Sequence, residues 1–262
     1  MAEITAAMVK ALRDETGRGM MECKKALQEA DGDVEAARDL LRKKGLVKAE
    51  KRAERTTGEG LIAIKLLDGS AVMIQATCET DFCARNDEFQ AMVDRLVELA
   101  AEAPAGPIEA NDTMRDAVQA VQAKTGENMA YGRGVKIQAP RIGTYLHHNR
   151  KVGVIVGLDG EIDEETLSGV CMHIAFANPV AITPEDVPAD LVEKEKKFAT
   201  QEAIDSGKPP QIAEKIVAGK MRKFLAERAL LEQDYVRDDK KKVKEILGGA
   251  TVTAFARFAV GA

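Results

Sequence analysis

Tryptophan is absent from this sequence of 262 residues, and the other aromatic residues amount to seven phenylalanines and three tyrosines. So few rings leave little material for a surface that stacks nucleic-acid bases. The 38 basic residues are outnumbered by 43 acidic ones, and the net charge of −5 argues against a nucleic-acid-binding domain. Four cysteines are too few for a disulfide scaffold, and no two form a Cys-x-x-Cys pair, so we expect reduced thiols and a cytoplasmic protein.

Long apolar stretches are also missing from the sequence. No run approaches the roughly 18 residues that indicate a membrane span. The N-terminal residues Met1, Ala2 and Glu3 lack the basic and apolar blocks of a signal peptide. We therefore expect neither a membrane segment nor a secretion signal.

The motifs of catalysis and cofactor binding are absent as well. Neither G-x-x-x-x-G-K-[ST] nor G-x-G-x-x-G occurs, so no phosphate-binding loop is predicted. His147 and His148 are neighbours at a predicted strand end, where alternation points their side chains to opposite faces and away from a shared metal. A zinc site at Cys78 and Cys83 would need two more ligands, and no other cysteine or histidine lies near them in the sequence. His173 lies among apolar residues of a predicted helix, which indicates a structural role. We expect no enzyme activity, no metal and no cofactor.

Residues 1–55 show the pattern of a small three-helix bundle that leads into a polar linker. Glycine-containing breaks at 16–19 and 31–32 separate three stretches of helical periodicity, and we expect Gly45 to end the third. Helices of about ten residues are marginal alone, so the three must pack on one another. Residues 46–57 are polar and predict a solvated helical linker. The predicted inward positions are Ile4, Met8, Leu12, Met20, Cys23, Lys24, Leu27, Val34, Ala37, Leu40 and Leu41.

Residues 56–140 follow a different pattern, which predicts the first half of a core. Apolar runs at 61–67 and 71–77 flank Asp68 and Gly69, a strong short-range signal for a β-hairpin. Further along the chain, a helix from about Asp87, a shorter helix over 112–124 and a strand over 129–137 are predicted. The expected buried face of the first of these helices is Phe89, Met92, Val93, Leu96, Val97 and Ala100.

Residues 141–187 repeat this arrangement in a shorter form. Predicted strands over 142–147 and 152–158 precede a helix over 164–178, which is followed by a proline. We interpret the two stretches as related β-β-α halves with antiparallel strands. Helices on one face of such sheets give an α+β core.

Two charged helices are expected over residues 188–230, on either side of a proline-containing turn at 206–210. Their apolar stripes are narrow, which favours an antiparallel helical hairpin that projects from the body. Residues 231–262 return to the core, with a final strand over 251–260.

One connector, over residues 78–86, carries a large aromatic residue between acids. Phe82 could tuck under the following helix with Asp81 as its cap, or it could be presented to a partner, as aromatic anchors are at interface hot spots. Met20 and Met21 pose the same question, because adjacent methionines cannot both face one core. At least one of them should be exposed, where methionine adapts well to partner surfaces.

Several motifs, in order along the chain, resemble those of bacterial translation elongation factor Ts. The two most specific are LRDETGRGMMECKKAL at 12–27 and CETDF at 78–82. Shorter matches are GEN at 126–128, GTYLH at 143–147, SGKP at 206–209, LLEQ at 230–233 and FARF at 255–258. Cys83 departs from the pattern, since a branched apolar residue often follows the phenylalanine in that family.

The resemblance implies a guanine-nucleotide exchange factor for elongation factor Tu. It implies that Thr80, Asp81, Phe82 and Cys83 form the segment that dislodges a magnesium ion from the partner's nucleotide site. It further implies that the chain itself binds no nucleotide and works in a hetero-complex, and that the N-terminal module is similar to ubiquitin-associated domains. The other partner contacts carried over from the family are Arg13, Met20, Met21, Lys24, Gly126 and His147.

Two other classes of function remain open at this point. The N-terminal bundle could be a binding module for a ubiquitin-like or ribosomal surface, with the rest of the chain as scaffold. The stretch 38–55 carries eight basic and three acidic residues and could serve an RNA-associated adaptor, although a solvated linker explains that charge better. Salt-sensitive RNA binding would favour the adaptor.

Overall fold

The computed structural model describes residues 4–207 and 209–261, and for residues 45–53 it describes the backbone alone. The chain divides into two compact units, which are described separately. One comprises residues 1–63, 74–134 and 259–262, and the other comprises 64–73 and 135–258. Helices and antiparallel sheets occur together, as predicted for an α+β protein.

The chain begins with three helices that pack on one another, as predicted. They are α1 (Ala6–Thr16), α2 (Met20–Glu29) and α3 (Val34–Ala53). Thr5 caps α1, because its hydroxyl accepts a hydrogen bond from the Met8 amide at 3.3 Å, and Gly17 ends it in the left-handed region at φ 64°. The shared core of this N-terminal module is Val9, Leu12, Cys23, Ala26, Leu27, Ala37 and Leu41.

Two predictions for this module were wrong. Met20 and Lys24 are exposed, although both were placed on the inward stripe. Met20 is the first residue of α2, and side chains tilt toward a helix N-terminus, so its side chain extends past the helix end. Gly45 does not end α3, which continues to Ala53. A glycine costs a helix only about 1 kcal/mol relative to alanine, and the flanking lysines and alanines are good helix formers.

A four-stranded sheet follows, with strand order β1-β2-β4-β3. Its strands are β1 (Glu59–Leu67), β2 (Ser70–Cys78), β3 (Gly106–Ile108) and β4 (Met129–Gln138). The predicted turn at Asp68 and Gly69 joins β1 to β2, with Gly69 in the left-handed region. The short strand β3 was not foreseen, because Pro104 and Pro107 indicated only a chain break.

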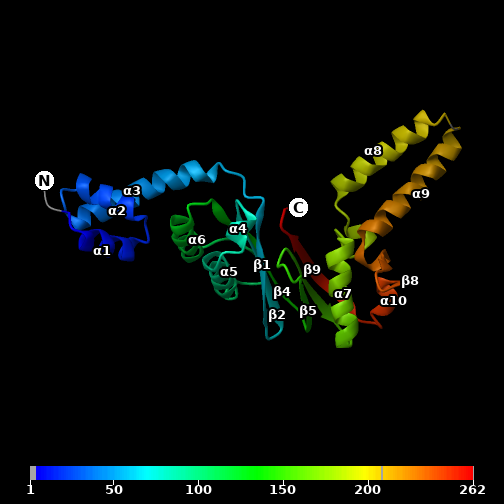
Figure 1. Ribbon diagram of the computed structural model, residues 1–262. Helices are drawn as coiled ribbons and strands as arrows, with labels where there is room; N and C mark the ends of the chain where they lie inside the picture. Colours follow the sequence, from blue (N-terminus) through cyan, green and yellow to red (C-terminus); the bar gives the residue numbers. More distant parts are fainter. Residues whose placement is uncertain (1–3, 208, 262) are drawn as a thin grey trace. The chain divides into compact units, whose positions relative to one another are not determined.

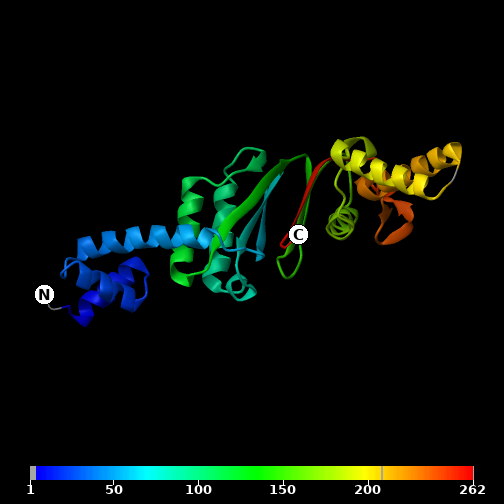
Figure 2. The same ribbon diagram turned by 90° about the horizontal axis from the view of Figure 1, so that it is seen from above.

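Two helices, α5 (Asp87–Ala100) and α6 (Asp112–Thr125), pack on each other and lie on one face of this sheet (Figures 1 and 2). The buried residues of α5 are the six that periodicity predicted, from Phe89 to Ala100. Between β2 and α5 lies α4 (Asp81–Ala84), a single helical turn. That turn replaces the irregular connector expected from the sequence.

A second sheet has the strand order β5-β6-β9. Its strands are β5 (Arg141–Leu146), β6 (Val152–Asp159) and β9 (Thr251–Ala259), and α7 (Glu164–Ala177) packs on β5 and β6 (Figure 1). The strands β5 and β6 are antiparallel, with Gly143 opposite Val156. Side chains of α7 and of these strands share one core, which includes Val154, Val156, Leu167 and Ile174. The predicted β-β-α order of this half is confirmed.

The predicted helical hairpin consists of α8 (Ala189–Asp205) and α9 (Pro210–Arg228), which pack along each other. Short elements on either side of it were not foreseen. They are η1 (Pro184–Asp186), η2 (Leu230–Glu232), β7 (Asp234–Tyr235), β8 (Asp238–Lys242) and α10 (Val243–Ile246). Their sequences are too short and too charged for a periodic pattern to show.

His173 of α7 holds this last region in place, in agreement with its interpretation as a structural residue. The side chain is 1% exposed, and its Nε2 lies 2.9 Å from Oε1 of Gln233. Its Nδ1 accepts a hydrogen bond from the Val236 amide at 3.2 Å. Because Nδ1 accepts, Nε2 carries the proton and the ring is neutral.

Candidate functional site: the Phe82 turn

Phe82 lies on α4, the helical turn that begins where β2 ends. Thr80 caps this turn, because its hydroxyl oxygen accepts a hydrogen bond from the Cys83 amide at 3.1 Å. Asp81 is not the cap; its carboxylate instead forms an ion pair with Arg85, one turn further on, at 3.1 Å. The turn is therefore closed at both ends by its own side chains.

The ring of Phe82 is 79% exposed, the highest value, shared with Phe176, among the large apolar side chains that the structure describes. The next two residues, Cys83 and Ala84, face inward and are 5% and 3% exposed. Successive positions of a helix point about 100° apart, so burying these two residues turns Phe82 outward. Of the two interpretations of Phe82, the one in which it tucks under its own helix is wrong.

Cys83 was grouped with the exposed segment, yet its thiol is buried beside that of Cys78. Burial raises the pKa of Cys83 to about 11, and the nearby Glu127 carboxylate contributes in the same direction. Burial likewise raises the pKa of Cys78, whose thiol donates to the Thr80 carbonyl at 3.3 Å. Both thiols are neutral packing groups beneath the turn, not reactive thiolates.

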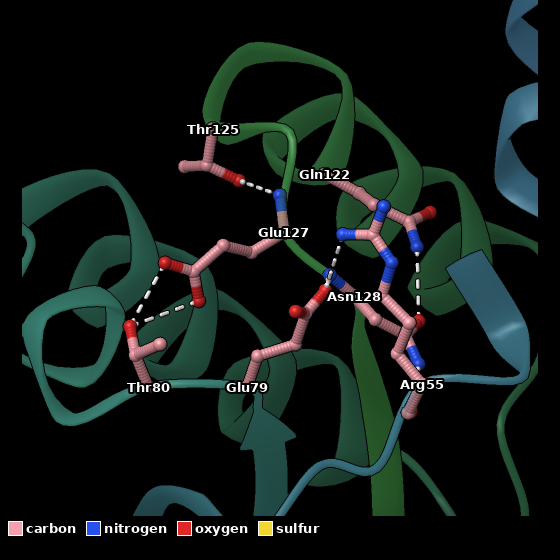
Figure 3. A network of polar contacts seen from close by, with 7 residues as sticks. All are labelled: Arg55, Glu79, Thr80, Gln122, Thr125, Glu127 and Asn128. Carbon is pink, nitrogen blue, oxygen red and sulfur yellow. Dashed lines mark hydrogen bonds and ion pairs between the residues drawn. The ribbon is translucent and has the colours of Figure 1, made fainter.

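A second segment, just after α6, is bonded to the Phe82 turn (Figure 3). Gly126 ends α6 in the left-handed region at φ 77°, and the chain then turns toward β2. The two oxygens of the Glu127 carboxylate accept a hydrogen bond from the Thr80 hydroxyl, with oxygen–oxygen distances of 2.8 and 3.1 Å. The Glu127 amide in turn donates to the Thr125 hydroxyl at 3.4 Å.

The next residues of the two segments, Glu79 and Asn128, form a second hydrogen bond, in which the segment after α6 supplies the donor and the segment after β2 the acceptor. The Asn128 amide donates to the Glu79 carboxylate, which also pairs with Arg55 at 3.3 Å. The Asn128 side chain donates to the Arg55 carbonyl at 2.8 Å and accepts from Gln122 at 3.2 Å (Figure 3). We call residues 79–80 and 127–128, with these bonds, the clasp.

Sequence reasoning selected Thr80 and Gly126 from this region and missed Glu79, Glu127 and Asn128. The motif GEN at 126–128 was quoted, but nothing in it indicates which side chain reaches the turn. Glu127 and Thr80 are 47 residues apart, and no local spacing rule relates positions that far apart. The two segments come together because β2 and β4 are neighbours in the sheet, with residues 79–80 directly after the end of β2 and residues 127–128 directly before the start of β4.

The structure places five of the six remaining predicted contacts at exposed positions, whereas the sixth, His147, is half-buried. In the N-terminal module, Met20 and Met21 are 53% and 64% exposed, and Arg13 and Lys24 are exposed as well. Gly126 is exposed at the end of α6. For the methionine pair, the expectation that at least one is exposed is therefore confirmed.

His147 follows the end of β5, and its ring lies close to that of His148, with centroids 4.2 Å apart. The prediction that the two side chains point to opposite faces was wrong. Strand alternation ends at Leu146, and the chain turns at His148, so the rule no longer applies. The Nδ1 of His147 lies 2.7 Å from the Tyr145 hydroxyl, which fixes the ring.

Three further features bear on function. The described residues contain no cluster of three or more histidine, cysteine, aspartate or glutamate side chains that could hold a metal ion. Within the same ranges, none of the helices combines the length and apolar character that a bilayer crossing requires.

Of the basic residues from 38 to 55, Arg38 pairs with Glu15 and Glu35, and Lys44 pairs with Glu29, while the side chains of 45–53 lie outside the described part.

Comparison with known proteins connects these features to one family. A family model for "Elongation factor TS" matches residues 79–262. The "Elongation factor Ts" of Photobacterium profundum is 43% identical over 263 residues, covering 100% of this chain and 93% of the relative. That of Vibrio parahaemolyticus is 44% identical, with 100% and 92% covered, and that of Shewanella sediminis 45% identical, with 98% and 91% covered. The chain therefore belongs to the elongation factor Ts family.

Proposed function

We propose that this chain is a guanine-nucleotide exchange factor for elongation factor Tu and acts in translation elongation in the cytoplasm. It forms a hetero-complex with the GDP-loaded GTPase, displaces its magnesium ion and promotes GDP release. The chain contributes no nucleotide site and makes or breaks no covalent bond. Membership of the family supports this assignment, and the exposed ring of Phe82 is the observation that carries the mechanism.

The exposure of Phe82 supports a role as an inserted anchor. A ring left in water gains about 1.5–3 kcal/mol when it enters an apolar pocket. Here the gain is not offset by the cost of ordering a loop, because Thr80 and the Asp81–Arg85 pair already fix the turn. The segment Thr80–Cys83 therefore offers an anchor at low entropic cost, and its residue Cys83 is buried beneath the turn.

Exchange requires the factor to bind the nucleotide-free partner more tightly than the loaded partner. In this proposal Phe82 enters a pocket that is fully open only when the elements holding the magnesium's water ligands have shifted. Loss of a divalent cation leaves the charge of the diphosphate poorly compensated, and GDP dissociates.

The other contacts supply binding that is common to both states. We assign this role to Arg13, Met20, Met21 and Lys24 of the N-terminal module, together with Gly126 and His147. Residues 1–55 and 56–140 face the GTPase domain of the partner, and 141–187 face its third domain. In this arrangement 188–230 is a separate hairpin and 231–262 returns to the core.

The first prediction concerns Phe82→Ala. Stopped-flow release of fluorescent GDP from elongation factor Tu should be accelerated by the wild-type chain. Phe82→Ala should slow that release by roughly 10- to 100-fold at equal concentration, because the burial energy of the ring is lost. The matched control is Phe198→Ala, which removes another exposed aromatic residue, 63% exposed on α8. This variant should accelerate GDP release from elongation factor Tu as much as the wild-type chain does.

Unfolding measurements complete this experiment. Phe82→Ala should shift the thermal midpoint little, since the ring makes few contacts in the free chain. If the wild-type chain leaves GDP release unchanged, the assignment as an exchange factor fails. If the two alanine variants accelerate GDP release from elongation factor Tu equally, the exchange role survives and the anchor role of Phe82 does not.

A further inference from the structure

The clasp joins two segments that the proposed function treats as separate partner contacts. Phe82 lies beside one of them and Gly126 beside the other, and each hydrogen bond between the two segments is accepted by a carboxylate side chain (Figure 3). The Glu127 carboxylate accepts a hydrogen bond from the Thr80 hydroxyl, and the Glu79 carboxylate accepts one from the Asn128 backbone amide. A displacement of either segment therefore moves the other.

The Thr80 hydroxyl is the critical group in this arrangement. It has one proton to donate and lone pairs to accept with. The proton is directed to Glu127 at 2.8 Å, which leaves a lone pair for the Cys83 amide at 3.1 Å. Without the carboxylate, the side chain of Thr80 is free to rotate, and the cap of the turn is satisfied only part of the time.

Glu127 is itself held in place. Its amide donates to the Thr125 hydroxyl at 3.4 Å, and that hydroxyl donates to the Val121 carbonyl of α6 at 3.1 Å. The backbone that carries this carboxylate is thus fixed to the end of a regular helix and not to a loose loop. An acceptor held on a rigid element fixes the orientation of its donor most effectively.

We infer that Glu127, acting through Thr80, is a positioning residue that aims Phe82 for the exchange reaction. This inference rests on the proposed function. The side chain of Glu127 acts on the turn and not on the partner's nucleotide, so it contributes to the step in which the ring inserts. Initial capture of the GDP-loaded partner depends on the N-terminal module and is independent of Glu127.

Saturation kinetics of GDP release test the inference. Glu127→Ala should lower the maximal release rate about tenfold, as expected for a lost hydrogen bond to a charged group, while the half-saturating factor concentration changes little. Glu127→Gln retains an acceptor oxygen and should recover most of the rate. The matched control is Glu88→Ala, which removes an exposed carboxylate that pairs with Lys124 at 2.9 Å between α5 and α6 and should leave both constants unchanged.

A double-mutant cycle asks whether Glu127 acts through Thr80. Thr80→Val removes the hydroxyl but keeps the shape, whereas Thr80→Ser retains the hydroxyl and should keep the rate. If the bond is the route, the variant carrying both Thr80→Val and Glu127→Ala should be no slower than Thr80→Val alone. Losses that multiply, or a wild-type rate for Glu127→Ala, would overturn the inference.

Amide hydrogen exchange of the free chain gives a readout that does not need the partner. Glu127→Ala should accelerate exchange at the Cys83 amide, and Glu88→Ala should not. Unchanged protection at Cys83 contradicts the positioning role even if exchange activity falls. Conversely, if the wild-type chain does not accelerate GDP release from elongation factor Tu, the proposed function is wrong. Hydrogen exchange at the Cys83 amide still decides whether Glu127 holds the turn.

Discussion

Phe82 shows how the burial of neighbouring residues can expose an apolar side chain. Cys83 and Ala84 occupy the inward positions of a four-residue turn, and no inward position is left for the ring. The small thiol of Cys83 is buried, and burial raises its pKa to about 11, so it stays neutral beneath the turn. Exposure of Phe82 therefore follows from what lies beneath the turn.

His173 provides a prediction at the scale of one residue. Burial lowers its pKa below the ordinary value of about 6.5. Above that pH the ring is neutral in both the folded and the unfolded chain, so stability does not depend on it. As pH falls below 6.5 the unfolded chain takes up a proton and the folded chain resists, so unfolding free energy should fall by up to about 1.4 kcal/mol per pH unit.

Urea unfolding at pH 7.5, 6.5 and 5.5 would check this expectation. His173→Gln has no titrating ring and should lose less stability over this range than the wild type does. Parallel curves for the two proteins would mean that His173 is protonated as easily when folded as when unfolded.

Individual residues were predictable from sequence where a local rule governs them. The six buried positions of α5 follow from helical periodicity, and the exposure of one methionine in the pair follows from their adjacency. The clasp was not predictable, because Glu127 and Thr80 meet through the pairing of β2 with β4, and no local pattern shows which distant strands pair. The proximity of His147 and His148 was missed because alternation was extended two residues beyond the strand, which ends at Leu146.

At the scale of elements, the close packing of α7 on β5 depends on Gly143. A Cβ atom there would lie 2.6 Å from Cδ1 of Leu167, 2.7 Å from Sγ of Cys171 and 2.9 Å from Cγ1 of Val156. These neighbours come from α7 and from β6, and all are buried in one core. The absence of a side chain at Gly143 sets how closely the helix approaches the strand.

Gly143→Ala should therefore destabilise the chain by about 1–3 kcal/mol, the usual cost of overpacking a core. Its matched control is Gly219→Ala in α9, where a Cβ meets no atom within 4 Å. That change should stabilise the chain by about 0.5–1 kcal/mol, because glycine is unfavourable inside a helix. Equal urea midpoints for the two variants would contradict the close-packing argument.

Elements longer than about eight residues were largely predictable, since each contains two or more turns of periodic pattern or a clear hairpin signal. The exceptions have physical explanations. Gly45 failed as a stop signal because the residues around it favour helix strongly enough to continue α3. The charged strand β8 carries no apolar alternation, and its pairing with β7 is set by the surrounding fold.

At the scale of the whole molecule, the proposed exchange is a coupling between two ligands of one partner. The factor weakens GDP binding by some ratio, and GDP must weaken factor binding by the same ratio. If Phe82 is the source of the coupling, Phe82→Ala should lower this ratio by roughly tenfold or more. Calorimetric titration of nucleotide-free and GDP-loaded elongation factor Tu with each variant measures it directly.

The alternative outcome is equally informative. Phe82→Ala could weaken binding to both forms of the partner by one common factor and leave the ratio unchanged. The ring would then contribute uniform affinity, and the expulsion of magnesium would have to arise from another contact.

The exposed pair Met20 and Met21 has a practical consequence for such measurements. Peroxide oxidises accessible thioethers to sulfoxides, which are polar and no longer fit an apolar surface. An aged preparation with both sulfur atoms oxidised would retain its fold, because neither side chain lies in the core of the N-terminal module. Intact-mass analysis before each titration, and treatment with methionine sulfoxide reductase where needed, would separate chemical ageing from a true change in affinity.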